Sequence, residues 1–133
     1  RIFQDDRCSM EELIKALKGN GIDIYFLSAG IVPPVRAAAE YFGIPLENVI
    51  GSHLAVSEGK YTVEVLSNYA VKASVVRQRL PNSPLLVVGN SARSDFGMME
   101  EALGVVFMIN PDSSLKERDE NEARGLFVEL SYP

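Results

Sequence analysis

Apolar residues recur at helical spacing in the stretch 9–19, where three of them fall on one face of a helix. Ser9 and Glu12 have the spacing of a capping box, in which each side chain accepts a hydrogen bond from the other residue's backbone N–H. The sequence Gly-Asn-Gly at 19–21 is typical of a helix C-terminus. The pattern therefore predicts a first helix that begins after Ser9 and ends at this turn.

Apolar runs of strand length then alternate with helical patterns along the chain. The first run, Ile22 to Leu27, is mostly apolar, which predicts a strand covered on both faces. Strands that alternate with helices form a parallel sheet with helices on both sides, the α/β class. Further strands are predicted at 84–89, 104–109 and 126–130, and further helices at 33–42, 67–80, 112–124 and after the loop that follows residue 89.

The middle of the chain departs from this alternation. β-Branched residues lie on both sides of the sequence Ser-Glu-Gly-Lys at 57–60, which predicts a β-hairpin over about 48–66. We expect one core domain over 1–133, with this hairpin as an insertion. A generic flavodoxin-like or receiver-type fold is an alternative that the hairpin disfavours.

Composition and charge narrow the class of protein. The chain has 133 residues, enough for one compact domain, and its 47% hydrophobic and 23% charged residues are ordinary for a soluble globular protein. A formal net charge of −5 argues against a nucleic-acid or membrane-surface binder. Cys8 is the only cysteine, so no internal disulfide forms, and neither a membrane-spanning run nor a signal peptide is visible. We therefore expect a cytoplasmic protein.

Small and polar residues follow two of the predicted strands, at 28–30 and at 89–95. In a parallel α/β sheet, ligands bind beyond the carboxyl ends of the strands. Backbone N–H groups at the start of a helix favour an anion, and small residues let it approach closely. Both segments are therefore candidate binding sites for an anionic group, although ordinary turns between strand and helix have the same composition.

Lys72 is a third candidate, because it lies near the start of the helix predicted between these two strand ends. A lysine there can act as a point charge toward a phosphate. The alternative is a solvated lysine on the surface of the helix.

Taken together and in this order, the candidates resemble the haloacid dehalogenase superfamily of phosphohydrolases, in its phosphoserine phosphatase-like branch. The sequence YFLSAG resembles the second motif of that family, NYAVKASVVRQRL the third, and LLVVGNSARSDFGMM the fourth. The segment EYFGIPLENVIGSHLAVSEGKYTVEV resembles the part between the second and third motifs. The resemblance extends from Ser9 to Ile109 and implies a Rossmann-like three-layer sandwich with a mainly parallel sheet.

The resemblance implies a role for each matched residue in binding a phosphoryl group. The Ser28 hydroxyl would hydrogen-bond a phosphoryl oxygen, and the backbone of Ala29 and Gly30 would add donors. Lys72 would neutralise the phosphoryl group and the nucleophile beside it. Phosphoryl transfer depends chiefly on such positioning and charge neutralisation.

The resemblance also implies a Mg²⁺ cofactor held by Asn90 and Asp95, directly or through water. Oxygen ligands of this kind suit Mg²⁺. The fourth motif of the family normally begins Gly-Asp, whereas this chain has Asn90 after the glycine. An amide brings no charge, so we expect weaker metal binding than in a protein with the usual carboxylate.

The first motif of the family, an Asp-x-Asp after an apolar strand, is absent. Asp5 and Asp6 form the only Asp pair, no apolar strand of adequate length precedes them, and we interpret them as solvated surface. The missing strand is central in the family's sheet. We therefore expect this chain to be the carboxy-terminal part of a longer protein, whose remaining part was cleaved off or is carried on another chain. The missing part as a separate segment, or a second copy of this chain, would then be a partner.

Two functions remain open. The first is a Mg²⁺-dependent phosphomonoester hydrolase that acts on a small phosphorylated substrate through an aspartyl-phosphate whose aspartate lies outside this chain. The second is a non-catalytic α/β phosphate-binding or interaction domain that has lost the nucleophile. In either case we expect this chain alone to be inactive as a phosphatase.

Overall fold

The computed structural model describes residues 9–64, 69–114 and 126–130. The predicted surface pair Asp5-Asp6, Cys8 and most of the helix predicted at 112–124 lie outside the described residues. The chain divides into two compact units, Arg1–Val65 and Leu66–Pro133. The expectation of a single core domain over 1–133 stays a prediction.

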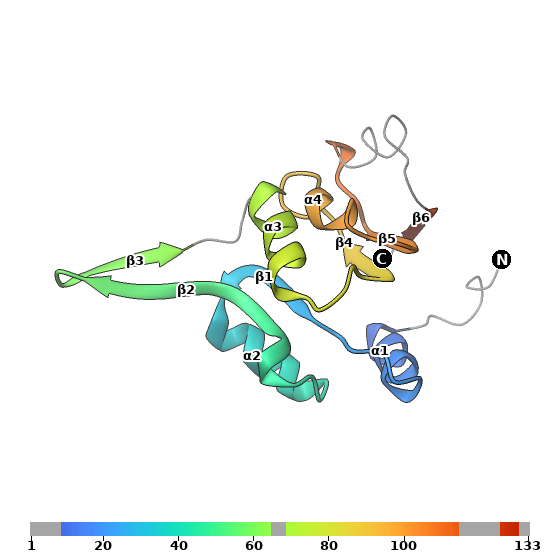
Figure 1. The fold of residues 1–133 in the computed structure, drawn as a ribbon, viewed down its shortest axis with the longest axis horizontal. Coiled ribbons are helices and arrows are strands. Elements are labelled where there is room, and N and C mark those ends of the chain that lie inside the picture. Colours follow the sequence, from blue (N-terminus) through green and yellow to red (C-terminus); the bar gives the residue numbers. More distant parts are fainter. Residues whose placement is uncertain (1–8, 65–68, 115–125, 131–133) are drawn as a thin grey trace. The chain divides into compact units, whose positions relative to one another are not determined.

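The first unit begins with a helix and continues as strand, helix and hairpin (Figure 1). Its elements are α1 (Met10–Gly19), β1 (Phe26–Ile31), α2 (Val32–Tyr41), the 3₁₀ helix η1 (Leu46–Asn48), β2 (Val49–Ser57) and β3 (Lys60–Glu64). β2 pairs in parallel with β1 and antiparallel with β3. The strand–helix–strand part of the prediction is therefore confirmed.

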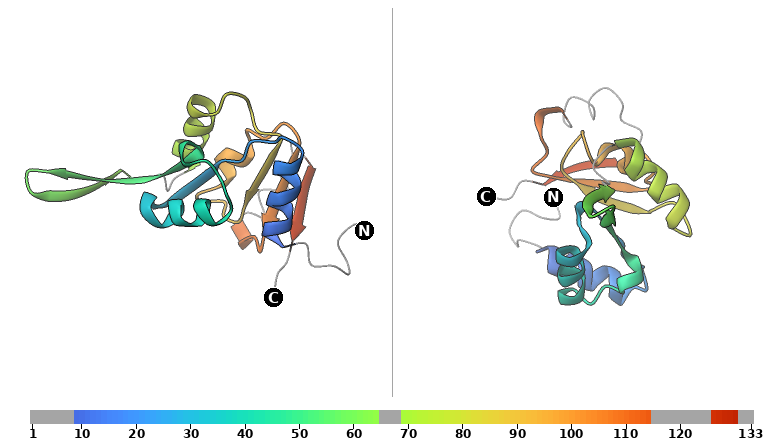
Figure 2. Two further views of the ribbon diagram at one scale, coloured as in Figure 1. Left: turned by 90° about the horizontal axis from the view of Figure 1, so that it is seen from below. Right: turned by 90° about the vertical axis from the view of Figure 1, so that its left-hand side faces the viewer.

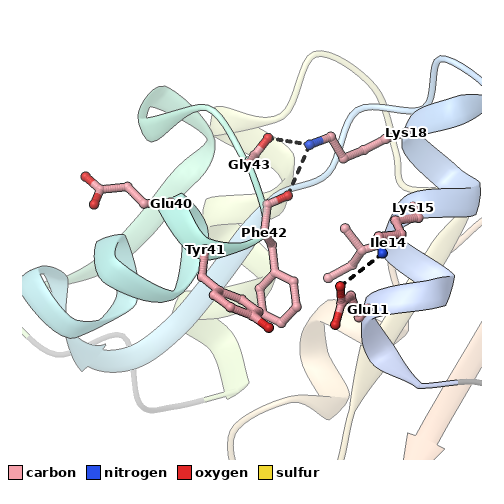
Figure 3. Close-up of a pocket in the computed structure, with 8 residues that line it drawn as sticks. All are labelled: Glu11, Ile14, Lys15, Lys18, Glu40, Tyr41, Phe42 and Gly43. Atoms are coloured by element: carbon pink, nitrogen blue, oxygen red, sulfur yellow. Dashed lines mark hydrogen bonds and ion pairs between the residues drawn. The ribbon is translucent and has the colours of Figure 1, made fainter.

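The predicted capping box at the start of α1 is present. Ser9 N donates to Glu12 Oε2 at 2.7 Å, and Glu12 N donates to Ser9 Oγ at 3.2 Å. At the other end of α1, Lys18 Nζ donates to the carbonyl oxygens of Phe42 and Gly43, at 3.1 and 2.6 Å (Figure 3). Lys18 thus links the C-terminal ends of α1 and α2 by hydrogen bonds. The same unit has a small core formed by Ile14, Ala39 and Ile44.

The position of the first strand was predicted wrongly. β1 spans Phe26–Ile31, four residues later than the predicted start at Ile22. Ile22 belongs instead to the end of α1: its N–H donates to Leu17 O at 3.1 Å, and Gly21, at a φ of 71°, donates to Lys18 O at 3.0 Å. This pair of bonds is a Schellman cap, which uses the residue after the glycine to close the helix.

Because β1 begins and ends later than predicted, the small residues 28–30 lie inside the strand rather than after it. The strand also has no fully buried residue, and its last two residues are exposed, so the expected cover on both faces is not found in the described unit.

A hairpin is present, over a shorter range than the predicted 48–66, of which 65 and 66 lie outside the described residues. Residues 53–57 of β2 pair antiparallel with 60–64 of β3. The two loop residues, Glu58 and Gly59, have φ values of 52° and 73°, the positive angles that a type I′ turn needs.

The second unit holds a parallel sheet with the strand order β4-β5-β6 (Figure 2). Its elements are α3 (Tyr69–Arg79), β4 (Leu86–Gly89), α4 (Phe96–Met99), β5 (Val105–Ile109) and β6 (Leu126–Leu130). Phe96, Met99 and Val106 are almost fully buried and form the centre of its core. α4 has only four residues, because the predicted helix continues beyond Met99 as turns.

Among the described strands, β1 and β4 each pair with one neighbour and therefore lie at an edge of their sheets. The predicted α/β class with mainly parallel strands is confirmed. That a central strand is missing from the sheet stays a prediction.

Candidate functional site

The carboxylate of Asp95 is the centre of a buried hydrogen-bond network in the second unit. Lys72 Nζ lies 2.6 Å from Asp95 Oδ1, and the two side chains are only 6% and 8% exposed. Ser94 Oγ donates to the same oxygen at 2.9 Å. Lys72 is thus a buried, paired cation, and its alternative interpretation as a solvated helix residue is wrong.

The other oxygen of this carboxylate holds the loop after β4. Asp95 Oδ2 accepts hydrogen bonds from Asn90 N at 3.0 Å and from Ser91 N at 3.2 Å. The Asn90 carbonyl in turn accepts from Asp112 N at 3.1 Å. The carboxylate therefore orders the loop and places Lys72 beside it.

Two opposing effects act on the pKa of Asp95. Burial raises it. It is lowered by the hydrogen bond from the Asn90 backbone, by the hydrogen bond and charge of Lys72, and to a smaller extent by Ser94, and this lowering outweighs the effect of burial. The pKa of Asp95 consequently lies below its ordinary value, and the carboxylate is ionised opposite the ammonium group. A lysine buried to this degree would be costly without such a partner.

Gly89 makes room for this network at the end of β4. A Cβ added there would lie 2.7 Å from Met99 Cε and 2.9 Å from Asp95 Cβ. Only glycine leaves the Asp95 side chain its place against the strand end. The small residue at this position is therefore explained by packing within the unit.

The segment around Ser28 forms a second polar cluster, in the first unit. Gly30 N donates to Ser28 Oγ at 3.0 Å, and Ser52 Oγ donates to Ala29 O at 2.8 Å. The N–H of Gly30, expected as a donor to a ligand, is therefore already hydrogen-bonded to Ser28. Because Ser28 Oγ accepts this bond, the hydroxyl hydrogen of Ser28 takes no part in it.

Ser52 and Gly51 were missed by the sequence-based prediction. Ser52 is 1% exposed, and a Cβ on Gly51 would lie 3.0 Å from the Gly30 carbonyl oxygen. The available signal was a small Gly-Ser pair that interrupts the apolar start of the hairpin's first strand.

The structure thus brings Lys72, Asn90 and Asp95 together in one unit and keeps Ser28, Ala29 and Gly30 together in the other. That Ser28 and Lys72 contact the same phosphoryl group, as the resemblance implies, stays a prediction. A cavity of about 390 Å³ in the first unit, between α1 and the end of α2, contains none of these residues (Figure 3).

A metal site is not complete within the described ranges, which hold no group of three or more His, Cys, Asp or Glu side chains placed to bind an ion. Asp95 already accepts four hydrogen bonds, and Asn90 is exposed. In the same described part of the chain, no helix is long and apolar enough to cross a membrane.

Comparison with known proteins gives matches in sequence and in structure. No family model matches the chain. The chain is 40% identical over 45 residues to a chloroplastic phosphoserine phosphatase of Arabidopsis thaliana, a match that covers 34% of this chain and 15% of that protein. A solved structure of a substrate-bound phosphoserine phosphatase complex matches over 90% of this chain and 57% of its own, with a TM-score of 0.67 and 25% identity.

The chain resembles the phosphoserine phosphatase-like branch of the haloacid dehalogenase superfamily. This confirms the resemblance predicted from the motifs and the predicted fold. A functionally unknown protein from Anaerococcus prevotii shares the fold, with a TM-score of 0.65 and 21% identity over 89% of this chain and 36% of its own. The chain spans less than two thirds of each of these proteins.

Proposed function

We propose that this chain carries the phosphoryl-binding part of a haloacid dehalogenase-type phosphatase that hydrolyses a small phosphorylated substrate. The observation that supports this most strongly is the buried pair of Lys72 and Asp95 at the end of β4. These two residues match the third and fourth motifs of the family, and their order after the Ser28 segment is that of the family. A purely structural role would not require a charged pair at this position.

In this proposal the Ser28 hydroxyl and the backbone of Ala29 bind phosphoryl oxygens. The bond from Gly30 N to Ser28 Oγ fixes the serine oxygen, so that its hydrogen is free to point at the ligand. Lys72, held by Asp95, supplies positive charge to the same phosphoryl group. Preorganised donors and charge of this kind stabilise the transition state without rearrangement during the reaction.

We further propose that the cofactor is Mg²⁺, held by Asn90 and Asp95, directly or through water, together with ligands from outside this chain. Bound Mg²⁺ would neutralise charge on the phosphoryl group. Asp95 fits this role through a water molecule, because four donors already surround its carboxylate. The exposed Asn90 side chain offers an amide oxygen.

The nucleophilic aspartate lies, in this proposal, outside the 133 residues, and the protein is cytoplasmic. We therefore expect the purified chain to give no turnover of an aryl phosphate with Mg²⁺ above the rate of a heat-denatured sample. Turnover that survives Asp5→Ala and Asp6→Ala would contradict this placement of the nucleophile.

A non-catalytic phosphate-binding domain is the second candidate, and the neutral Asn90 at an acidic position of the motif favours it. The sequence that the natural gene encodes upstream of Arg1 distinguishes the two candidate functions. An Asp-x-Asp after an apolar strand, encoded upstream of Arg1, supports the phosphatase, and the lack of one supports the binding domain.

A further inference from the structure

The parallel pairing of β1 with β2 is interrupted at Ser28–Gly30. From Leu27 to Ile31, β1 advances by four residues, while β2 advances by only two, from Ile50 to Ser52. The additional residues of β1 form a bulge outside the regular ladder. Their backbone N–H and C=O groups therefore need other partners.

Two serine side chains supply partners at this bulge. Within β1, Ser28 Oγ accepts the N–H of Gly30 at 3.0 Å. From β2, Ser52 Oγ donates to the carbonyl of Ala29 at 2.8 Å. Ser52 is only 1% exposed, so water cannot readily replace its hydroxyl.

The residue before Ser52 provides the space for the bulge. A Cβ on Gly51 would lie 3.0 Å from the carbonyl oxygen of Gly30 and 3.3 Å from Val32 Cγ2. Contacts at 3.0 Å to backbone are not relieved by rotating a side chain. Two consecutive residues of β2 thus shape the bulge, one by a hydrogen bond and the other by lacking a side chain.

We propose that Ser52 is a positioning residue, whose hydroxyl holds the Ala29 carbonyl and thereby sets the direction of the Ser28 hydroxyl toward a phosphoryl group. The inference rests on the proposed function, because the bulge matters for catalysis only if a phosphoryl group binds there. Small displacements of such donors weaken binding and catalysis strongly. Ser52 does not itself touch the ligand.

The test compares three variants of the 133-residue chain by ¹H–¹⁵N NMR. Ser52→Ala removes the hydroxyl, Ser52→Thr keeps it, and Ser57→Ala is the matched control, an exposed serine of the same strand. The first readout is the amide resonances of 28–31 in the free protein. The second is the dissociation constant for inorganic phosphate, followed through the same amides.

We expect Ser52→Ala to shift the resonances of 28–31 and to raise the dissociation constant about tenfold, the equivalent of one lost hydrogen bond. Ser52→Thr should restore both readouts to near the wild-type values, and Ser57→Ala should change neither. Unchanged resonances and affinity in Ser52→Ala would overturn the proposal. So would a Ser52→Thr protein that folds and is as impaired as Ser52→Ala.

If Ser52→Ala does not fold, Gly51→Ala tests the bulge instead, because it places a methyl group against the Gly30 carbonyl oxygen. It should shift the resonances of Gly30 and weaken phosphate binding, and an unchanged affinity would overturn the proposal. If the wild-type chain shows no phosphate-dependent shift at 28–31, the proposed function fails at this site. The comparison of resonances in the free proteins then still decides whether Ser52 positions the bulge.

Discussion

Replacing Lys72 by Met removes the cation of the buried pair while keeping most of the side chain's volume. The ammonium group lies 2.6 Å from Asp95 Oδ1, and both side chains are more than nine-tenths buried. Removing one partner of such a pair leaves an uncompensated charge and costs about 3–5 kcal/mol. Three other donors still reach the Asp95 carboxylate, so we expect a loss near 3 kcal/mol in the free energy of unfolding.

Arg77→Met is the matched control, because Arg77 lies on the same helix and pairs with Glu101. Its side chain is 59% exposed, and exposed ion pairs contribute about 0–1 kcal/mol. Urea unfolding followed by far-UV circular dichroism at pH 7 gives both free energies. Equal losses in the two variants, or a loss below about 1 kcal/mol in Lys72→Met, would refute the assignment of Lys72 as a buried partner.

The ion pair of Lys72 and Asp95 also predicts that the free energy of unfolding depends on pH. Because folding lowers the pKa of Asp95, its contribution to stability is complete above the unfolded pKa of about 3.9 and is lost as the pH falls through the lower folded pKa. The difference between wild type and Lys72→Met should therefore narrow below about pH 4. A difference that stays constant down to pH 2 would contradict this.

Three further predictions concern single positions. Gly89→Ala should cost about 1–3 kcal/mol in urea unfolding, because its Cβ would meet Asp95 Cβ at 2.9 Å, whereas Gly19→Ala, with nothing within 4 Å, should not destabilise the chain. Ser9→Ala should cost about 1 kcal/mol through the loss of the capping box, also measured by urea unfolding; no change would mean that α1 does not depend on it. If Asn90 holds Mg²⁺ as proposed, Asn90→Asp should tighten Mg²⁺ binding at least about tenfold in calorimetric titration, because a carboxylate adds charge near the ion; an unchanged affinity would make Asn90 a turn residue.

The order of helices and strands could be predicted from the sequence because local signals repeat in each element. The Ser9–Glu12 capping box and the hairpin turn at Glu58 and Gly59 depend on neighbouring residues in the sequence, and both are present as predicted. The start of β1 was misplaced because Ile22 is apolar yet serves the helix cap, which depends on backbone geometry. Periodicity alone does not separate a cap residue from the first residue of a strand.

The candidate residues could be predicted from their order, but their contacts could not. That the Lys72 ammonium pairs with Asp95, 23 positions away, depends on how α3 packs beside the loop after β4. Ser52 was missed for the same reason, since its bond to Ala29 crosses from one strand to the next. The Gly-Ser pair marks this position in the sequence, but it does not indicate which backbone group the serine hydroxyl contacts.

The proposal that Ser28 and Lys72 bind the same phosphoryl group is tested most directly by titrating ¹⁵N-labelled chain with inorganic phosphate. The amides of 28–31 and of 89–95 should then shift with a single common dissociation constant, and Ser28→Ala should weaken the response of both segments. Shifts in only one segment, or two unrelated dissociation constants, would contradict the proposed phosphoryl site.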